Sequence, residues 1–184
     1  MDTGDNQNKE KLHLGCGNQI LSGFLNVDLA PLPGVDVVHD LTQMPWPFHE
    51  GQFKEIIAVH LLEHLPNTVK VVEELWRIGR RDARLNIRVP YWNSHHSIAD
   101  PTHIKLFNHK SLDFFDPRKR DCKERPYYSK ARFIIEKIYY WRPLIGEKGW
   151  IRIGNPVLKK IMDFFATYLN NIIWVLEFDL KVIK

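Results

Sequence analysis

The sequence contains only two cysteines among its 184 residues, Cys16 and Cys122. A disulfide framework needs more than this, so we expect a fold held together by its hydrophobic core. No apolar run reaches the roughly 18 residues of a membrane-spanning helix, and the polar start, residues 1–10, is not a signal peptide. Internal repeats and low-complexity tracts are also missing. These absences predict a cytoplasmic globular protein.

Extreme charge is missing as well. The formal net charge is +4, which is less than dedicated nucleic-acid-binding proteins carry. With 44% hydrophobic and 26% charged residues, the chain suits one domain, residues 1–184, with a substantial core. Positive charge gathers in residues 118–132, where two tyrosines lie among the lysines and arginines. This stretch is either a solvated loop, which we favour, or a patch for phosphates or an anionic membrane surface.

The most informative stretch is residues 11–29. An apolar strand leads into Gly15-Cys16-Gly17, and a second apolar strand ends at Asp28. Glycines let backbone N–H groups approach a ligand that a Cβ would keep away. A carboxylate at the end of the neighbouring strand is placed to accept hydrogen bonds from the hydroxyls of a ribose. The pattern therefore predicts a nucleoside cofactor.

The spacing within this stretch distinguishes two cofactors. The dinucleotide fingerprint requires a third glycine or alanine and an acidic residue about 20 residues further on. Here Ile20 occupies the third position, and Asp28 lies 11 residues past Gly17. A bulky isoleucine at that point argues for a ligand without a pyrophosphate. The spacing favours S-adenosylmethionine over NAD, with an ordinary turn of an α/β protein as the remaining alternative.

The rest of the chain alternates between strand and helix patterns, which is typical of an α/β protein with a largely parallel sheet. We expect a long, irregular and functional connection in residues 91–117. Asn155 should cap a helix whose apolar stripe is core, with use at a membrane surface as the alternative. Further strands are predicted at residues 35–39, 53–59, 85–90, 133–140 and 174–183, and helices at residues 66–80 and 156–172.

Taken together, these segments resemble the class I S-adenosylmethionine-dependent methyltransferases, particularly small type-11-like members. The resemblance covers about the first half of the chain and is carried by the segments LHLGCG, GFLNVDL, VVHDL, FKEIIAVHLLEHL and ELWRIGRRDARLNIRVP. A further segment, ADPTHIKLFNHKSLDFF, resembles small members linked to sugar or cell-envelope modification. The resemblance implies a Rossmann-like sandwich with a largely parallel seven-stranded sheet.

The resemblance also implies roles for individual residues. The backbone of the glycine turn would contact the methionine and ribose parts of the cofactor, and Asp28 would bind the ribose hydroxyls. Asp40 and Leu41 match the position that reads the adenine, while His60 matches the position beside the reacting methyl group. His64 would support the fold. The cofactor-binding residues implied in this way are Gly15, Cys16, Gly17, Asp28, Asp40, Leu41 and His60.

The connections after Gly17 and Leu29 are too short for crossover helices, which need about a dozen residues. Helices on one face of the sheet are therefore reduced, although a parallel sheet is normally covered on both faces. We predict that residues 91–130, the helix beginning after Asn155 or a partner subunit covers that face. Residues 1–10 should be flexible, and residues 155–184 should form a terminal helix and strand.

Four polar residues follow the fifth predicted strand, where substrates bind in open α/β sheets. We predict that they line the acceptor site and that one histidine removes the proton of a hydroxyl acceptor. An Asx-type turn that only holds the loop is the alternative. A zinc, iron or manganese site is a second alternative, although we expect no metal. The four residues are His95, His96, Asp100 and His103.

The leading hypothesis is an S-adenosylmethionine-dependent methyltransferase that acts on a small molecule or a glycan, at oxygen, by in-line transfer. One alternative is a non-catalytic protein of the same fold that binds cofactor and contacts a membrane or a partner. Another is an RNA methyltransferase that contacts phosphates through residues 118–132. Peripheral membrane contact and a homodimer are further expectations.

Overall fold

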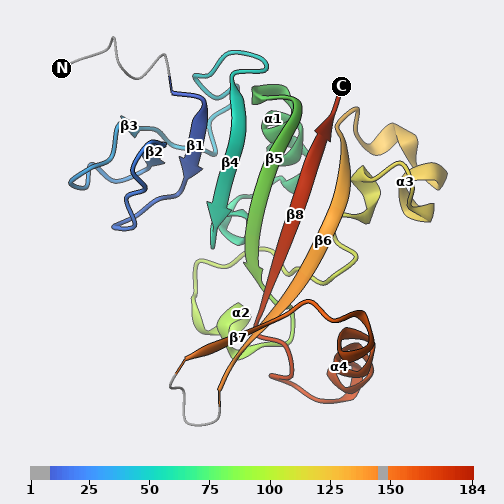
Figure 1. Ribbon diagram of the computed structural model, residues 1–184. Helices are drawn as coiled ribbons and strands as arrows, with labels where there is room; N and C mark the ends of the chain where they lie inside the picture. Colours follow the sequence, from blue (N-terminus) through green and yellow to red (C-terminus); the bar gives the residue numbers. More distant parts are fainter. Residues whose placement is uncertain (1–8, 145–148) are drawn as a thin grey trace.

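The computed structural model describes residues 9–144 and 149–184, so most of the start that we predicted to be flexible lies outside the described residues. The described chain forms one eight-stranded sheet in the order β3-β2-β1-β4-β5-β8-β6-β7 (Figure 1). β1 to β5 run parallel to one another, whereas β8 is antiparallel to β5 and β6. The strands are β1 (Lys11–Leu14), β2 (Leu25–Asp28), β3 (Val37–Val38), β4 (Phe53–Val59), β5 (Gly79–Pro90), β6 (Arg132–Pro143), β7 (Trp150–Ile153) and β8 (Val175–Ile183). The predicted α/β fold is confirmed.

The sheet has one strand more than the seven we predicted. The additional strand, β7, pairs antiparallel with β6 and forms the outer edge of the sheet. It is only four residues long, and three of them are exposed, so it leaves no apolar pattern in the sequence. At the opposite edge, β3 contains only two of the five residues predicted for it.

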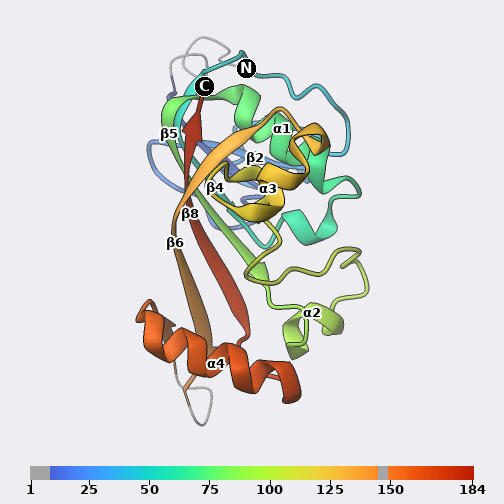
Figure 2. The ribbon, with the colours of Figure 1, turned by 90° about the vertical axis from the view of Figure 1, so that its right-hand side faces the viewer.

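One face of the sheet is covered by α1 (Thr68–Ile78), η3 (Asp113–Phe115) and α3 (Arg120–Glu124), which lie on the same side in Figures 1 and 2. Asn67 caps α1 by accepting a hydrogen bond from the Lys70 N–H. The helix buries Val72 and Leu75 against the sheet. Leu112 and Phe115 from the η3 region complete the same apolar layer. Hydrophobic burial is therefore concentrated on this face.

The other face of β4, β5, β8 and β6 has no helix over it within the described residues (Figures 1 and 2). Our prediction that residues 91–130 or the terminal helix cover this face is wrong. The apolar side chains of residues 91–130, such as Phe115, are instead used on the α1 side. The uncovered face carries polar side chains, including Asn86 and Asp179, which are stable in contact with water. Cover by a partner subunit stays a prediction.

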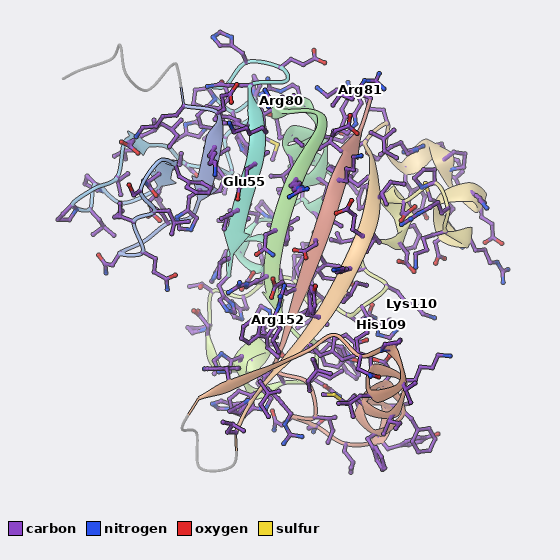
Figure 3. The ribbon with its side chains drawn as sticks, in the orientation of Figure 1. Glu55, Arg80, Arg81, His109, Lys110 and Arg152 are labelled. Carbon is purple, nitrogen blue, oxygen red and sulfur yellow. The ribbon has the colours of Figure 1, made fainter. Side chains whose placement is uncertain are left out.

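A buried carboxylate organises this uncovered face. Glu177 on β8 is only 1% exposed, and its two oxygens accept four hydrogen bonds. Asn86 and the Arg152 Nη2 donate to Oε1 at 2.8 and 2.7 Å, and Trp141 and the Arg152 Nε donate to Oε2 at 2.6 and 3.0 Å. Arg152 extends over the converging ends of β5 and β8 (Figure 3). The network ties β5, β6, β7 and β8 together where crossover helices would otherwise pack.

A second polar device holds the short connection between β1 and β2. The Asn26 side chain is 3% exposed and lies on β2. Its amide donates to the carbonyl groups of Leu21 and Phe24 at 3.1 and 3.2 Å, and its oxygen accepts from the Leu21 N–H at 3.0 Å. Asp36 accepts from the Asn26 N–H at 2.7 Å. Hydrogen bonds therefore fix a loop that is too short to contain a helix.

The terminal helix, α4 (Pro156–Tyr168), begins as predicted, because the Asn155 side chain accepts hydrogen bonds from two N–H groups of the first turn. The prediction that its apolar stripe is core is wrong. Only Met162 and Ala166 are buried. The outward side chains are 43% to 74% exposed: Val157, Leu158, Ile161, Phe164, Phe165, Tyr168 and Leu169.

The reason for this exposure is the position of α4 across the end of the sheet (Figure 2), where a narrow strip that includes Met162 and Ala166 is buried. Asp163 on this strip accepts a hydrogen bond from the Tyr140 hydroxyl at 2.7 Å and lies 3.4 Å from His109 (Figure 3). Lys159 donates to the Ile138 carbonyl at 2.7 Å. None of the helices within the described ranges has the length and apolar content needed to cross a bilayer.

Candidate active site

The glycine turn and Asp28 form one structural unit at the carboxyl ends of β1 and β2. Gly15 and Gly17 have φ values of +63° and +49°, a conformation that L side chains rarely adopt. The Gly17 N–H donates to Asp28 Oδ2 at 2.7 Å, and the Ala30 N–H donates to Oδ1 at 3.0 Å. The structure therefore brings together the turn and the carboxylate that the sequence paired.

Two of the predicted cofactor residues, Cys16 and Leu41, are buried in the glycine turn and after the end of β3. The Cys16 N–H donates to the Val27 carbonyl at 3.0 Å, its thiol is buried, and burial raises the pKa of that thiol. Leu41 is 5% exposed and belongs to the core. Asp40 is partly exposed, and a hydrogen bond from the Thr42 hydroxyl at 2.7 Å lowers the pKa of its carboxyl group.

His60 lies at the carboxyl end of β4 and has a φ of +51°, which is uncommon for a residue with a side chain. Such conformations are concentrated at functional sites. The next residue, Leu61, fills the space beside the glycine turn, since its Cδ1 lies 3.0 Å from the position that a Cβ on Gly15 would occupy. The glycine turn and the histidines that follow β4 are therefore neighbours.

A cavity of about 440 Å³ opens beyond the carboxyl ends of β4 and β5. It is lined by all four predicted acceptor-site residues, His95, His96, Asp100 and His103, together with His60 and His64. His95 and His96 are on α2 (His95–Ala99), whose first N–H is held by Asn171 near the end of α4. The structure thus gathers residues that are more than 40 positions apart in the sequence into one pocket next to the glycine turn.

The predicted turn at Asp100 is also present. Asp100 Oδ1 accepts hydrogen bonds from the N–H and hydroxyl of Thr102 at 2.8 and 2.6 Å. These bonds lower the pKa of the Asp100 carboxyl group. His103 is largely buried, and its Nδ1 lies 3.1 Å from the Ser97 carbonyl oxygen. Asp100 therefore fixes the conformation of the loop that carries His103.

Two residues of this pocket region were missed as site residues. Glu63, which is 1% exposed, and His64 lie on the 3₁₀ turn η2 (Leu62–His64). The rings of His64 and His103 have centroids 4.7 Å apart, so His64 contributes to the site as well as to the fold. The signal was available, because His60, Glu63 and His64 fall within five consecutive positions.

A smaller cavity of about 200 Å³ adjoins the first through His60. It is lined by Arg88, Trp141 and Trp150 as well as Val59 and Val175. The Arg88 guanidinium lies 5.2 Å from the Trp141 ring. Aromatic side chains next to a small number of polar groups are typical of pockets for organic ligands.

The basic stretch, residues 118–132, is folded rather than a loop. Arg118 contacts the fully buried Asp116 through two guanidinium nitrogens and donates to the Ile135 carbonyl. Arg132 donates to three backbone carbonyl groups, and Arg125 faces Asp121 at 3.6 Å. Several of its cations are thus used inside the fold, which favours a structural role for the stretch.

No protein-family model matches the chain, and no curated protein matches it in sequence. Solved structures do match. A methyltransferase from Archaeoglobus fulgidus, described as S-adenosylmethionine-dependent, has 17% identity and a TM-score of 0.57, with 95% of this chain and 88% of that chain covered. A Thermotoga maritima protein described as a possible histamine N-methyltransferase has 10% identity and a TM-score of 0.58, with 92% and 81% covered.

A third similar structure is phosphoethanolamine N-methyltransferase 2 of Haemonchus contortus, in complex with phosphomonomethylethanolamine and S-adenosylhomocysteine. It has 13% identity and a TM-score of 0.58, and the alignment covers 96% of this chain and 49% of that chain. At such identities the likeness establishes the fold. The chain has the fold of S-adenosylmethionine-dependent methyltransferases, as the sequence resemblance predicted.

Proposed function

We propose that this protein is an S-adenosylmethionine-dependent methyltransferase that methylates an oxygen atom of a small molecule or a glycan. The observation that carries the proposal is the contact between the Gly17 N–H and Asp28, at the same sheet edge as the histidine pocket. Donor and acceptor sites must adjoin for an in-line displacement, because the reacting atoms have to be held about 3 Å apart.

The choice of S-adenosylmethionine as the cofactor is supported by the groups at the carboxyl ends of β1 and β2. Asp28 ends β2 as a partly exposed carboxylate, and its oxygens already receive the N–H groups that fix the turn. Further hydrogen bonds from ribose hydroxyls can be accepted because each carboxylate oxygen has two lone pairs. His60 would then lie beside the reacting methyl group.

The acceptor class is supported by the two cavities that meet at His60. The tryptophan-lined cavity offers a surface for a ring, and the larger cavity offers His95, His96 and His103 as acceptors for a hydroxyl proton. An imidazole is suited to this role near neutral pH. In the transfer, the acceptor oxygen forms the new C–O bond, the C–S bond breaks, and the electron pair of that bond remains on the sulfur.

Thermal unfolding with S-adenosylmethionine or S-adenosylhomocysteine tests the cofactor, with NAD as the control ligand. A ligand at 100 times its dissociation constant adds about 2.7 kcal/mol of stability, which corresponds to roughly 5–10 °C for a domain of this size. We expect the shift to be lost in Asp28→Asn. The matched control is Asp36→Asn, which removes a carboxylate from the amino end of β3. Absence of a shift in the native chain would overturn the proposal.

Turnover tests the acceptor site. Release of S-adenosylhomocysteine is measured on pools of hydroxylated small molecules and glycans, for the native chain and for His95→Gln, His96→Gln and His103→Gln. We expect at least one variant to lose about 100-fold or more in kcat, which is the usual contribution of a general base. Native turnover in all three variants would exclude a base among these histidines.

The exposed face of α4 favours a second role, namely contact with a phospholipid surface. Its outward side chains include Phe164, Phe165 and Tyr168, and Lys160 flanks them. Trp150 and Ile151 on β7 are also exposed, at the same end of the molecule. Apolar and aromatic residues with a lysine border are typical of helices that lie in a membrane interface.

Flotation with vesicles tests this role. We expect the chain to float with vesicles that contain anionic lipid, and Phe164→Ser with Phe165→Ser to abolish flotation. The control replaces Lys123 by Ser, because Lys123 lies on the exposed part of α3. Light scattering tells this role from self-association. A stable dimer that fails to float and dissociates in the serine variant would show that a second copy covers α4.

A further inference from the structure

The proposed methyl transfer gives no role to the Glu63 carboxylate, which lies beside the acceptor cavity. Glu63 is 1% exposed, and its Oε2 has no hydrogen-bond partner among the described residues. Its backbone is fixed, because the Glu63 carbonyl accepts from the N–H groups of Ile104 and Lys105 at 2.9 and 3.1 Å. Buried charged groups are normally paired or coordinate a metal. An unpartnered carboxylate oxygen at this place therefore points to a cation.

Two histidines face this carboxylate from opposite segments of the chain. The imidazole of His64 follows Glu63 on η2, and that of His103 comes from the loop after α2. Their rings meet edge to face at 4.7 Å. One ligand atom from each of Glu63, His64 and His103 lies within 4.8 Å of the other two.

The hydrogen bonds around both imidazoles leave the right nitrogen for a metal. His103 Nδ1 lies 3.1 Å from the Ser97 carbonyl, which can only accept, so Nδ1 carries a proton and, in the neutral imidazole, Nε2 has the lone pair. The Thr102 hydroxyl donates to Asp100 and therefore accepts from His64 Nδ1 at 2.9 Å. In the neutral imidazole, His64 Nε2 then also has the lone pair. Oxygen acceptors that fix the tautomer in this way are the usual outer partners of metal-binding histidines.

The distances fit an ion better than a direct contact. His103 Nε2 lies 3.9 Å from Glu63 Oε1 and 3.9 Å from Asp100 Oδ2, which is too long for a hydrogen bond in both cases. Glu63 Oε2 is the carboxylate oxygen left for an ion. Ligand atoms around a tetrahedral ion with bonds of about 2.1 Å are roughly 3.4 Å apart. Glu63 Oε1 already receives the His60 Nδ1 at 3.2 Å, which orients the carboxylate in the manner of an outer-shell partner.

We propose that Glu63, His64 and His103 bind a divalent transition metal such as zinc, iron or manganese. Two imidazole nitrogens and one carboxylate oxygen form a donor set that suits these ions and leaves coordination positions open. The set differs from the metal alternative raised from the sequence, with which it shares only His103. It assigns His103 to metal binding and keeps His95 and His96 as the candidate bases.

The site borders the acceptor cavity, which His64 and His103 both line. A metal there would bind the acceptor oxygen and lower the pKa of its hydroxyl group, so that the proton leaves to a histidine before or as the oxygen attacks. This consequence rests on the proposed methyltransferase function, whereas metal binding itself does not.

Metal binding is measured on the full chain without cofactor or acceptor. Titration with Co²⁺ followed by visible absorption, and with Zn²⁺ by calorimetry, should give one saturable site per chain. Glu63→Gln, His64→Ala and His103→Ala should each weaken binding at least about 100-fold, since each removes a ligand. The matched controls are His95→Gln and His96→Gln, which alter the same cavity outside the three ligands and should keep the site.

Circular dichroism establishes that each variant is folded. If Glu63→Gln fails to fold because of its burial, the partly exposed His64 supplies the decisive variant. Absence of saturable binding, or binding that survives the loss of His64 and His103, would overturn the proposal. Saturable metal binding without a thermal response to S-adenosylmethionine would support the metal site and count against the methyltransferase, so the two failures are distinguishable.

Discussion

Glu177→Gln should destabilise the fold more than any other single exchange of a carboxylate for an amide on the uncovered face. The glutamine amide must place an NH₂ group against either Asn86 and one Arg152 nitrogen or Trp141 and the other. In either orientation of the amide, two N–H donors lose the carboxylate oxygen that accepted from them and face the glutamine NH₂ group, which is itself a donor. Breaking a fully buried ion pair from one side costs about 3–5 kcal/mol, and the lower end of this range applies here because the Arg152 side chain is 40% exposed. For a domain of this size the melting temperature should fall by about 10 °C.

Urea unfolding at neutral pH measures this loss, with Asp179→Asn as the matched control. Asp179 lies two residues further along β8, accepts from Asn86 at 2.8 Å and is 33% exposed, so its exchange should cost less than about 1 kcal/mol. If the two variants were equally stable, the reasoning about the buried network would be refuted.

The same residue gives a pH dependence. Burial acts to raise the pKa of Glu177, but hydrogen bonds from Arg152, Asn86 and Trp141 outweigh it and hold the pKa below its ordinary value. The stabilisation is fully present above the unfolded-state pKa and is lost as the pH falls through the folded-state pKa. The stability difference between the native chain and Glu177→Gln should therefore shrink in acid, and a constant difference would contradict this assignment.

Three further predictions concern stability. Asp116→Asn should cost about 2–4 kcal/mol in urea unfolding, because a fully buried carboxylate loses its charged pairing with Arg118, and a change below 1 kcal/mol would disprove it. Met162→Ala should cost about 2–3 kcal/mol and Phe164→Ala less than about 0.5 kcal/mol, since only the former is buried, and the reverse order would show that α4 packs differently. Gly34→Ala should lower the stability by about 1–3 kcal/mol, because Gly34 has a φ of +87° and an added Cβ would lie 2.7 Å from an isoleucine side chain, and a neutral melting temperature would count against this.

The parts of the fold that local pattern decides were predictable. β4 has the bounds that its apolar run predicts, and Asn155 with Pro156 marked the start of α4 correctly. β7 was not predictable, because its four residues are mostly exposed and its pairing with β6 is set by tertiary structure. The prediction that the apolar stripe of α4 is buried in the core was wrong for a related reason. A stripe at helical spacing shows that a helix is amphipathic, but only its neighbours decide which part of the stripe is buried.

The candidate site was predictable where the residues share a local motif. The glycine turn and Asp28 are close in sequence, and the structure joins them through a direct hydrogen bond. The pocket was predictable from the rule that ligands bind beyond the carboxyl ends of strands. Glu63 was missed because a single acidic residue gives no sign of its burial, although His60 and His64 lie close to it in the sequence. Its relation to His103 depends on a loop that returns from 40 residues away.

The hydrogen bonds of the Asn26 side chain and backbone have a consequence for the local opening of this part of the sheet. β1, β2 and β3 are joined by short loops that hydrogen bonds hold, and apolar side chains of these loops such as Ile20 and Leu29 are 40% and 67% exposed. Regions with few buried contacts open locally at a lower free energy than the core strands. Amide hydrogens of β2 and its loops should therefore exchange with solvent faster than those of β5 and β8. A ligand bound at the glycine turn would slow this exchange. The part of the sheet that binds the ligand is therefore also the part whose local opening the ligand would suppress.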